Sequence, residues 1–292
     1  MKALCKNDLL PVFSPLLNYI QQEAPLIHCI TNPVSINDCA NILLALGARP
    51  IMAEHPQEAA EIVSLAKALA LNLGTITDGS MAAMLIAGRT AHEKNIPIII
   101  DLVGVACSTL RMNFAQQLLQ ETRPDVIKGN ISELRALLGL PVTEGMGVEA
   151  GQKEMVTAEN AAEYAKIFTE KAREHHTVLL ATGPIDLVVS EDSSFMLSNG
   201  TNALAAITGT GCMTNVLGAA CLSAAHHLHR PAAEAGIMAC LLLGIAAENI
   251  HQVFTDCGPG SFHAQLMDSI SRLDAAALAD RGRVQSISLA NA

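Results

Sequence analysis

The sequence is poor in aromatic side chains and in positive charge. Its 292 residues contain no tryptophan, two tyrosines and six phenylalanines, and the formal net charge is −10. Proteins that bind nucleic acids use clusters of Lys and Arg to neutralise phosphates, and aromatic faces on which bases stack. The chain has neither feature, so we expect no nucleic-acid partner.

Paired cysteines and a secretion signal are also lacking. The eight cysteines contain no C-x-x-C pair, and the N-terminal stretch from Met1 to Asp8 has no apolar signal core. This pattern excludes the cysteine spacing of zinc ribbons and the disulfide framework of small secreted domains. We therefore expect reduced, mostly buried cysteines in a cytoplasmic protein.

Charged residues are sparse, at 16%, and half of the residues are hydrophobic, which is enough for a large core. One stretch, from Ser193 to His229, has no Asp, Glu, Lys or Arg and is long enough to span a bilayer. Its first half is rich in Asn, Thr and Gly, however, and its second half is typical of a buried core helix. We therefore expect no association with a membrane.

Short apolar runs alternate with longer amphipathic ones over the first two thirds of the chain. This alternation predicts a mostly parallel sheet covered by helices on both faces. The predicted strands are Leu26–Ile30, Pro50–Ala53, Ala68–Leu73, Pro97–Leu102, Asp125–Lys128 and Thr177–Ala181. The predicted helices among them are Val34–Leu46, Gln57–Ala66, Ser80–Glu93, Leu110–Thr122 and Ala158–Glu174.

The remaining third has a different pattern. A hairpin is predicted over Asp186–Ser190 and Ser194–Leu197, followed by helices over Cys212–His227, Pro231–Val253 and Ser261–Leu273. Leu140–Val156 is a predicted loop, and the tail over residues 280–292 is expected to be loose. With no repeat or linker, residues 1–292 are expected to form one α/β domain.

The segment from Ile207 to Cys212 is a glycine-rich turn that leads into a predicted helix. Gly209 and Gly211 allow backbone angles that let successive N–H groups point into one concavity, and the helix N-terminus adds a positive dipole end. Such a turn predicts an anion site. Cys212 lies where its side chain can reach the reacting group, and a helix N-terminus lowers the pKa of a thiol; the alternative is an inert buried cysteine.

Polar residues follow several predicted strands, where parallel sheets bind their ligands. Asp101 ends one apolar run, and Lys128 ends another, where it contacts phosphate or is a solvated edge charge. Asn130 and Glu133 are spaced as a capping box, but with Asp101 and the glycine turn they favour a hydrated Mg²⁺ site. His28 is expected to be a satisfied core histidine.

Several blocks resemble the hydroxyethylthiazole kinase family, in the family's order from about residue 26 to residue 262. The first blocks are His28–Val34, Ala40-Asn41, Leu44–Ala48, Pro50–Ala53, Asn72–Thr75 and Asp101–Val105. The later ones are Ile127–Glu133, Ala181–Gly183, Gly209–Cys212 and Gly258–Phe262. The glycine turn alone is weak evidence for the resemblance, whereas the ordered set is strong.

The resemblance implies a ribokinase-like three-layer sandwich without a lid domain, assembled as a homotrimer with active sites between subunits. It implies ATP-dependent phosphorylation of the hydroxyl of 4-methyl-5-(2-hydroxyethyl)thiazole in thiamine salvage. It assigns roles to thirteen residues: Met52, Gly209, Asn32 and Val34 at the thiazole; Lys128, Thr182, Asn130 and Gly183 at ATP; Asp101 and Glu133 near Mg²⁺; Gly209, Thr210, Gly211 and Cys212 in catalysis. Cys212 stands where most of the wider superfamily has an aspartate base.

Three departures from the family pattern concern the affinity for ATP. Leu102 follows Asp101 where the family usually has Pro, Lys128 stands where Arg is common, and Met146–Glu149 replaces the usual Lys-Gly-Val-Asp. Two alternatives stay open: a kinase for another small alcohol, such as hydroxymethylpyrimidine or a sugar, and a thiazole-binding protein without catalysis. A cysteine-nucleophile enzyme is disfavoured, since the sequence shows no base for Cys212.

Overall fold

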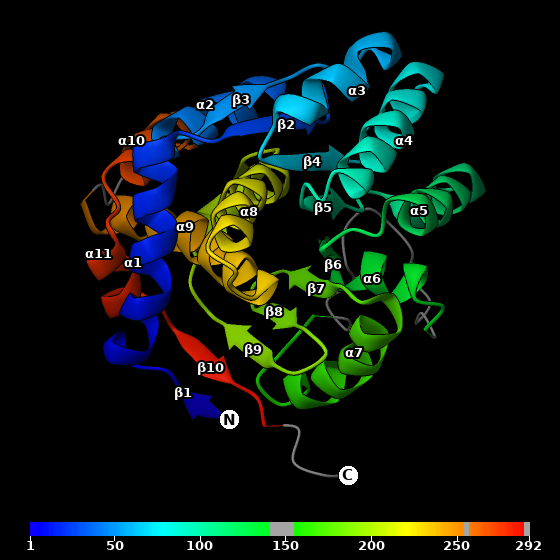
Figure 1. Cartoon of the computed structure of the whole chain (residues 1–292). Coiled ribbons are helices and arrows are strands. Elements are labelled where there is room, and N and C mark those ends of the chain that lie inside the picture. Colours follow the sequence, from blue (N-terminus) through cyan, green and yellow to red (C-terminus); the bar gives the residue numbers. More distant parts are fainter. Residues whose placement is uncertain (141–154, 254–256, 289–292) are drawn as a thin grey trace.

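The computed structural model describes residues 1–140, 155–253 and 257–288, and its strands form one ten-stranded sheet (Figure 1). Their order across the sheet is β1-β10-β9-β8-β7-β6-β5-β4-β2-β3. The strands are β1 (Lys2–Ala3), β2 (Leu26–Ile30), β3 (Arg49–Ile51), β4 (Ala68–Asn72), β5 (Ile98–Asp101), β6 (Val126–Asn130), β7 (Val178–Thr182), β8 (Asp186–Val189), β9 (Ser194–Leu197) and β10 (Val284–Ser286). All six predicted strands and the hairpin are confirmed, with ends shifted by at most two residues.

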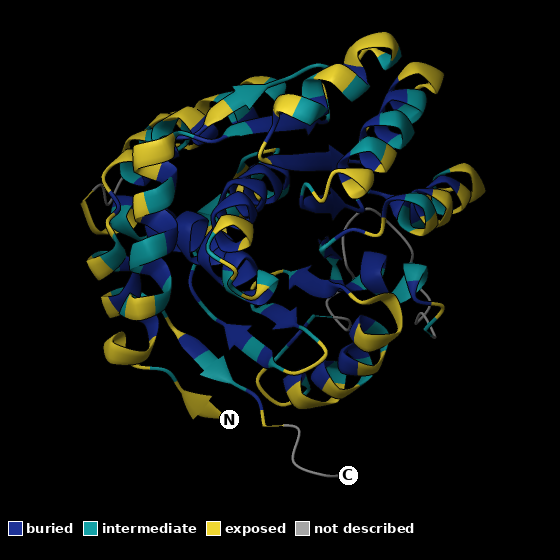
Figure 2. Ribbon diagram, viewed as in Figure 1, coloured by how far each residue is buried: buried dark blue, intermediate teal, exposed yellow. Residues whose placement is uncertain are grey.

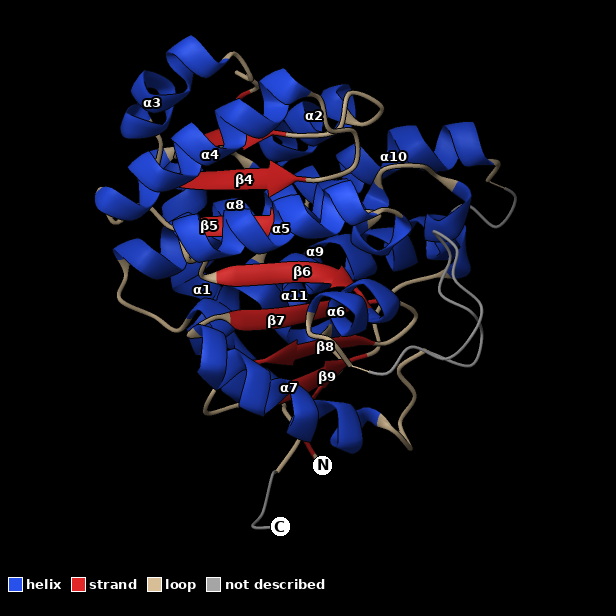
Figure 3. Cartoon of the chain, turned by 90° about the vertical axis from the view of Figure 1, so that its right-hand side faces the viewer, coloured by secondary structure: helices blue, strands red, loops and turns tan. Residues whose placement is uncertain are grey.

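The strands from β2 to β7 are parallel, and the arrows of β4 and β6 point the same way in Figure 3. From β7 onward the sheet continues antiparallel through β8, β9, β10 and β1. The prediction of a mostly parallel sheet is confirmed. Because all parallel strands end on one edge of the sheet, the polar residues that follow them gather there.

Helices cover both faces of the sheet, which confirms the three layers. One face carries α1 (Lys6–Glu23), α2 (Ile36–Leu46), α8 (Thr210–His227), α9 (Ala232–Val253), α10 (Pro259–Ser271) and α11 (Ala275–Arg281). The other carries α3 (Pro56–Leu65), α4 (Asp78–Glu93), α5 (Thr109–Thr122), α6 (Ile131–Leu137) and α7 (Ala161–His175). Short 3₁₀ helices span Val105–Cys107 and Asn202–Ala206.

The central strands are buried on both faces, and Figure 2 shows them in the colour of buried residues. Successive side chains alternate between the two cores: in β4, Ala68 and Ala70 face α8, whereas Leu69 and Leu71 face the opposite helices. Small residues on one side let α8 approach the sheet closely. Because alternate side chains enter two buried cores, the side chains on both faces of these strands are apolar, and the strands are continuous apolar runs in the sequence.

The expectation of a loose tail from residue 280 is wrong for the described part of that tail. Residue 280 lies in α11, and β10 pairs with both β9 and β1. The tail is ordered because β10 completes the antiparallel end of the sheet. The predicted loop Leu140–Val156 lies largely outside the described residues.

Helix α1 was not predicted from the sequence. It contains Pro11 and Pro15, which normally end helices, yet its apolar residues line one face that packs against α8 and α11. Tertiary packing therefore overrides two local breaking signals. Helix α9 is long and apolar enough to cross a membrane by composition, but 83% of its most apolar window is buried inside the protein, as expected of a core helix.

Candidate active site

Three polar side chains form a row across the carboxyl edge of the sheet. The strand register pairs Asn72 at the end of β4 with Asp101 at the end of β5, and Asp101 with Lys128 in β6. In each strand the residue two positions earlier faces α8, so these three side chains point toward α8 as well. The row therefore faces the N-terminus of that helix.

Asp101 and Lys128 form an ion pair of 2.9 Å inside the protein, with side chains only 0% and 3% exposed. Burial raises the pKa of Asp101 to about 6, although the Lys128 ammonium acts in the opposite direction. Burial tends to lower the pKa of Lys128, but the Asp101 carboxylate outweighs it and raises the pKa above its usual value. Lys128 is therefore a buried, paired cation, which excludes its interpretation as a solvated edge charge.

The glycine turn has the backbone that an anion site needs. Gly209 has φ of +85°, in the left-handed region, and a Cβ there would lie 2.8 Å from the Cβ of Ser35. A Cβ on Gly211 would lie 3.4 Å from the Lys128 Nζ. The first N–H groups of α8 have no intrahelical acceptor, so an anion at this turn meets both those N–H groups and the Lys128 ammonium.

Cys212 lies in the first turn of α8 and is 6% exposed. Its Sγ accepts a hydrogen bond from Asn72 Nδ2 at 3.2 Å. Burial and the nearby Asp101 carboxylate raise the pKa of Cys212, while hydrogen bonds from Ser35 and Asn72 act in the opposite direction. The expectation that the helix N-terminus lowers the pKa of this thiol is therefore wrong, because burial dominates.

Glu133 forms the capping box that its spacing allowed. Its backbone N–H donates to Asn130 Oδ1, and its Oε2 accepts from the Asn130 N–H at 2.7 Å. Its Oε1 accepts from the Gly104 N–H at 2.8 Å, which ties the loop after β5 to the first turn of α6. Within the described ranges no group of three or more His, Cys, Asp or Glu side chains could hold a metal on its own.

Two adjoining cavities of about 440 Å³ each open at this edge of the sheet. The inner one holds the anion site, and its lining includes Asn32, Val34, Ser35, Asp101, Lys128, Asn130, Glu133 and the turn Ile207–Cys212. The outer one is lined by Gly183, Asp186, residues 199–202 and parts of α8 and α9. Thr182, Thr210 and Gly211 line both, so a ligand longer than either cavity can extend from one into the other.

The model of the hydroxyethylthiazole kinase family matches residues 17–276. The chain belongs to that family. It is 44% identical over 251 residues to hydroxyethylthiazole kinase 2 of Clostridium botulinum, covering 86% of this chain and 91% of that protein. It is 35% identical over 287 residues to hydroxyethylthiazole kinase of Methanobrevibacter smithii, covering 96% and 98%.

Solved structures agree with this family membership. The hydroxyethylthiazole kinase protein of Pyrococcus horikoshii superposes with a TM-score of 0.80 at 33% identity, over 94% of this chain and 98% of that chain. A ribokinase-like superfamily protein of Enterococcus faecalis superposes with a TM-score of 0.57 at 13% identity, over 93% and 96%. The second likeness concerns the fold alone, and the ribokinase-like prediction is confirmed.

In this member of the hydroxyethylthiazole kinase family, most of the predicted site residues line one of the two cavities. The residues predicted to bind the metal or to take part in catalysis line the inner cavity, and so do Asn32 and Val34. Gly183 lines the outer cavity. Met52 is the exception: it follows the edge strand β3, is half-buried and lines neither cavity.

Several polar residues at the site were missed from the sequence. Asn72 ends an apolar run, as Asp101 does, and this position could have marked it as a site residue. With Asp101, Lys128 and Cys212 it forms what we call the inner cluster.

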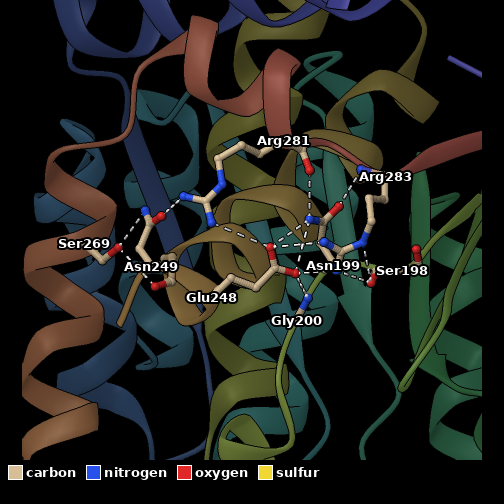
Figure 4. Close-up of polar contacts among 9 residues, drawn as sticks. Ser198, Asn199, Gly200, Glu248, Asn249, Ser269, Arg281 and Arg283 are labelled. Atoms are coloured by element: carbon tan, nitrogen blue, oxygen red, sulfur yellow. Dashed lines mark hydrogen bonds and ion pairs between the residues drawn. The ribbon is translucent and has the colours of Figure 1, made fainter. Parts of the chain in front are cut away.

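A second group, which we call the outer cluster, comprises Asn199, Gly200, Glu248, Arg281 and Arg283 (Figure 4). Glu248 of α9 accepts hydrogen bonds from Gly200 N at 2.8 Å and from Asn199 Nδ2 at 3.2 Å, and it pairs with both arginines. No pattern in the sequence points to this cluster, because its members are far apart along the chain.

Proposed function

We propose that this chain transfers the γ-phosphoryl group of ATP to the hydroxyl of 4-methyl-5-(2-hydroxyethyl)thiazole, in thiamine salvage. The observation that carries the proposal is the position of Lys128 Nζ, held by Asp101 against Gly211 in the anion-binding turn. Phosphoryl transfer needs positioning and charge neutralisation more than covalent chemistry from the protein. This arrangement of cation and N–H groups supplies both.

ATP would lie across the two cavities, with its phosphates at the turn that both share. Thr182, Asn130 and Gly183 line this path, and Gly209, Thr210 and Gly211 give the transferred group a backbone cradle. The N–H groups of the turn and the Lys128 ammonium would stabilise charge as it develops on the phosphoryl oxygens. The thiazole would occupy the inner cavity beside Asn32 and Val34.

Cys212 would orient the substrate hydroxyl and accept its proton. Its raised pKa keeps it a neutral thiol for most of the time at pH 7. In a loose transition state the alcohol loses its proton late, so a small thiolate fraction can suffice. The residue is therefore expected to affect the rate of turnover rather than the binding of ATP.

Mg²⁺ would be bound mainly by the ATP phosphates and by water. Both Glu133 oxygens already accept main-chain N–H groups, and Asp101 is paired with Lys128. These two carboxylates would therefore contact a hydrated Mg²⁺ through its water ligands rather than directly. Mg²⁺ supplies neutralisation of phosphate charge, and Asp101 and Glu133 orient its water shell.

The deciding experiment incubates the purified full chain with ATP and hydroxyethylthiazole, with and without Mg²⁺, and detects the phosphorylated product by mass spectrometry. Hydroxymethylpyrimidine, pyridoxal and ribose are compared in parallel. The expected result is Mg²⁺-dependent turnover with the thiazole preferred. Preference for another alcohol contradicts the substrate, and binding of thiazole without turnover contradicts the enzyme.

We further propose that the chain works as a homotrimer with sites between subunits. Val34, at the inner cavity, is 65% exposed, and Leu44 on α2 is exposed as well. Met52, which follows the edge strand β3, does not line the cavity of its own subunit. A neighbouring subunit could cover this face and bring Met52 to the thiazole.

Two measurements test the assembly. Mass photometry of the purified chain should give the mass of three subunits. Met52→Arg and Cys212→Ala chains, each of low activity, should recover activity when they are unfolded and refolded together, because mixed trimers contain intact sites. A fully active monomer contradicts the proposal.

A further inference from the structure

One side chain of the inner cluster connects the thiol to the ion pair. Asn72 is fully buried, and its Nδ2 donates to Asp101 Oδ2 at 3.1 Å and to Cys212 Sγ at 3.2 Å. An amide nitrogen carries two hydrogens, so one side chain satisfies both contacts at once.

The orientation of the Asn72 amide is fixed by the backbone. Its Oδ1 accepts the Gly74 N–H at 2.8 Å, so its nitrogen must face Asp101 and Cys212. The loop that carries Gly74 is itself held by Arg111, whose Nη2 donates to Gly74 O at 2.7 Å. The donor therefore has little freedom to turn away from the thiol.

We propose that Asn72 is a positioning residue that holds the Cys212 sulfur as a hydrogen-bond acceptor directed at the inner cavity, in register with Asp101 and Lys128. The inference rests on the proposed kinase activity and adds a residue to it. Asn72 and Ser35 donate to the sulfur, so the thiolate form keeps one lone pair to accept the proton of the substrate hydroxyl. These contacts run from Cys212 through Asn72 and Asp101 to Lys128. Because Cys212 and the Lys128 ammonium both lie at the glycine turn, the contacts fix the position of the proton acceptor relative to the phosphate-binding cation.

A double-mutant cycle tests this proposal. Asn72→Ala and Asn72→Leu both remove the donor to the Cys212 sulfur, and leucine keeps a side chain of similar size. Each should lower kcat about tenfold to a hundredfold, the effect expected for a lost hydrogen bond to a charged group, with KM for both substrates changed less than about threefold. In a Cys212→Ala background the same changes should lower kcat by less than about threefold, because the effect acts through the thiol.

Asn215 provides the matched control. Asn215 is also fully buried and lies in α8, one turn after Cys212. Its Nδ2 donates to Leu71 O in β4 at 3.1 Å. Asn215→Leu loosens α8 from β4 without removing a donor to the sulfur, so its effect should be the same with or without Cys212. Equal losses from the Asn72 variants in both backgrounds would overturn the proposal and leave Asn72 a packing residue.

A readout without turnover separates this inference from the proposed function. Iodoacetamide labelling of Cys212, followed by peptide mass spectrometry, should slow by about threefold or more in both Asn72 variants, since the reacting thiolate loses a donor. The exposed Cys5 serves as the internal reference. An unchanged Cys212 rate overturns the inference even if the wild-type chain phosphorylates the thiazole, and a slowed rate supports it even if another alcohol is the substrate.

Discussion

The inner and outer clusters both join acidic and basic side chains beside a cavity, but they differ in how completely their charges are satisfied. In the outer cluster, Glu248 accepts bonds from a backbone N–H and an amide and faces two arginines, one of them half exposed. In the inner cluster, a fully buried carboxylate has one amine and one amide. Well-satisfied polar groups stabilise a fold, whereas sparsely satisfied buried charge marks a functional site.

The comparison predicts that inner variants lower turnover, whereas outer variants affect stability and nucleotide affinity and leave turnover nearly unchanged. The largest effect is expected for Lys128→Met, which removes the cation at the transferred phosphoryl group and leaves Asp101 buried without its partner. We expect kcat to fall by about a hundredfold to a thousandfold and the free energy of unfolding by about 3–5 kcal/mol. Steady-state kinetics and urea unfolding measure the two quantities.

Lys128→Met combined with Asp101→Asn separates these two losses. The double variant has no unpaired buried charge, so it should regain most of the lost stability while turnover stays low. Recovery of turnover along with stability would show that the pair serves only the fold.

Cys212→Ala should lower kcat by about a hundredfold, the low end of the range for a general base, because the proton leaves late. The KM for ATP should change little, since the thiol takes no part in binding phosphate. Cys221→Ala is the control: it removes a fully buried cysteine of the same helix, outside both cavities. Similar kinetics for the two variants would remove Cys212 from the reaction.

The change of kcat with pH should be smaller than the effect of Cys212→Ala, but it tests whether Cys212 is the proton acceptor. Because the pKa of Cys212 is raised, the thiolate fraction at pH 7 is low and grows as the pH rises toward that pKa. We expect kcat to increase between pH 7 and 9, by at most about tenfold per pH unit. Cys212→Ala should flatten this rise; a rise that survives in the variant must come from another group.

Glu248→Gln should have the smallest effect on catalysis. A glutamine loses the charge that faces Arg281 and Arg283, so the segment with Asn199 and Gly200 at the outer cavity is held less firmly. We expect the KM for ATP to rise about threefold, kcat to stay within about twofold, and the Tm to fall by several degrees, in line with about 1.5–3 kcal/mol for a charged hydrogen bond.

Glu234→Gln is the matched control for that variant. Glu234 pairs with Arg230 four residues earlier at the start of α9, away from both cavities. A partly exposed pair of this kind contributes about 0.3–0.5 kcal/mol, so Tm and KM should hardly change. A fall in kcat for Glu248→Gln as large as for Cys212→Ala would erase the distinction between the clusters.

Local patterns predicted a large part of the fold. The strand Leu26–Ile30 was placed to the residue, because a buried parallel strand is a continuous apolar run with clear ends. Helix α1 was not predicted because Pro11 and Pro15 mask its apolar face, and β10 was missed because a strand of three residues is too short to show a periodicity of its own.

For the site, the sequence by itself determined which chemistry is available: an anion-binding glycine turn, a thiol at its end, and Asp101 and Lys128 after buried strands. These follow from backbone rules and from strand ends that must share one edge. Only the tertiary structure decided that Asp101 neutralises Lys128, that burial raises rather than lowers the pKa of Cys212, and that Asn72 joins them. Solvent exclusion and contacts between distant segments set these properties, and neither exists until the sheet and α8 have come together.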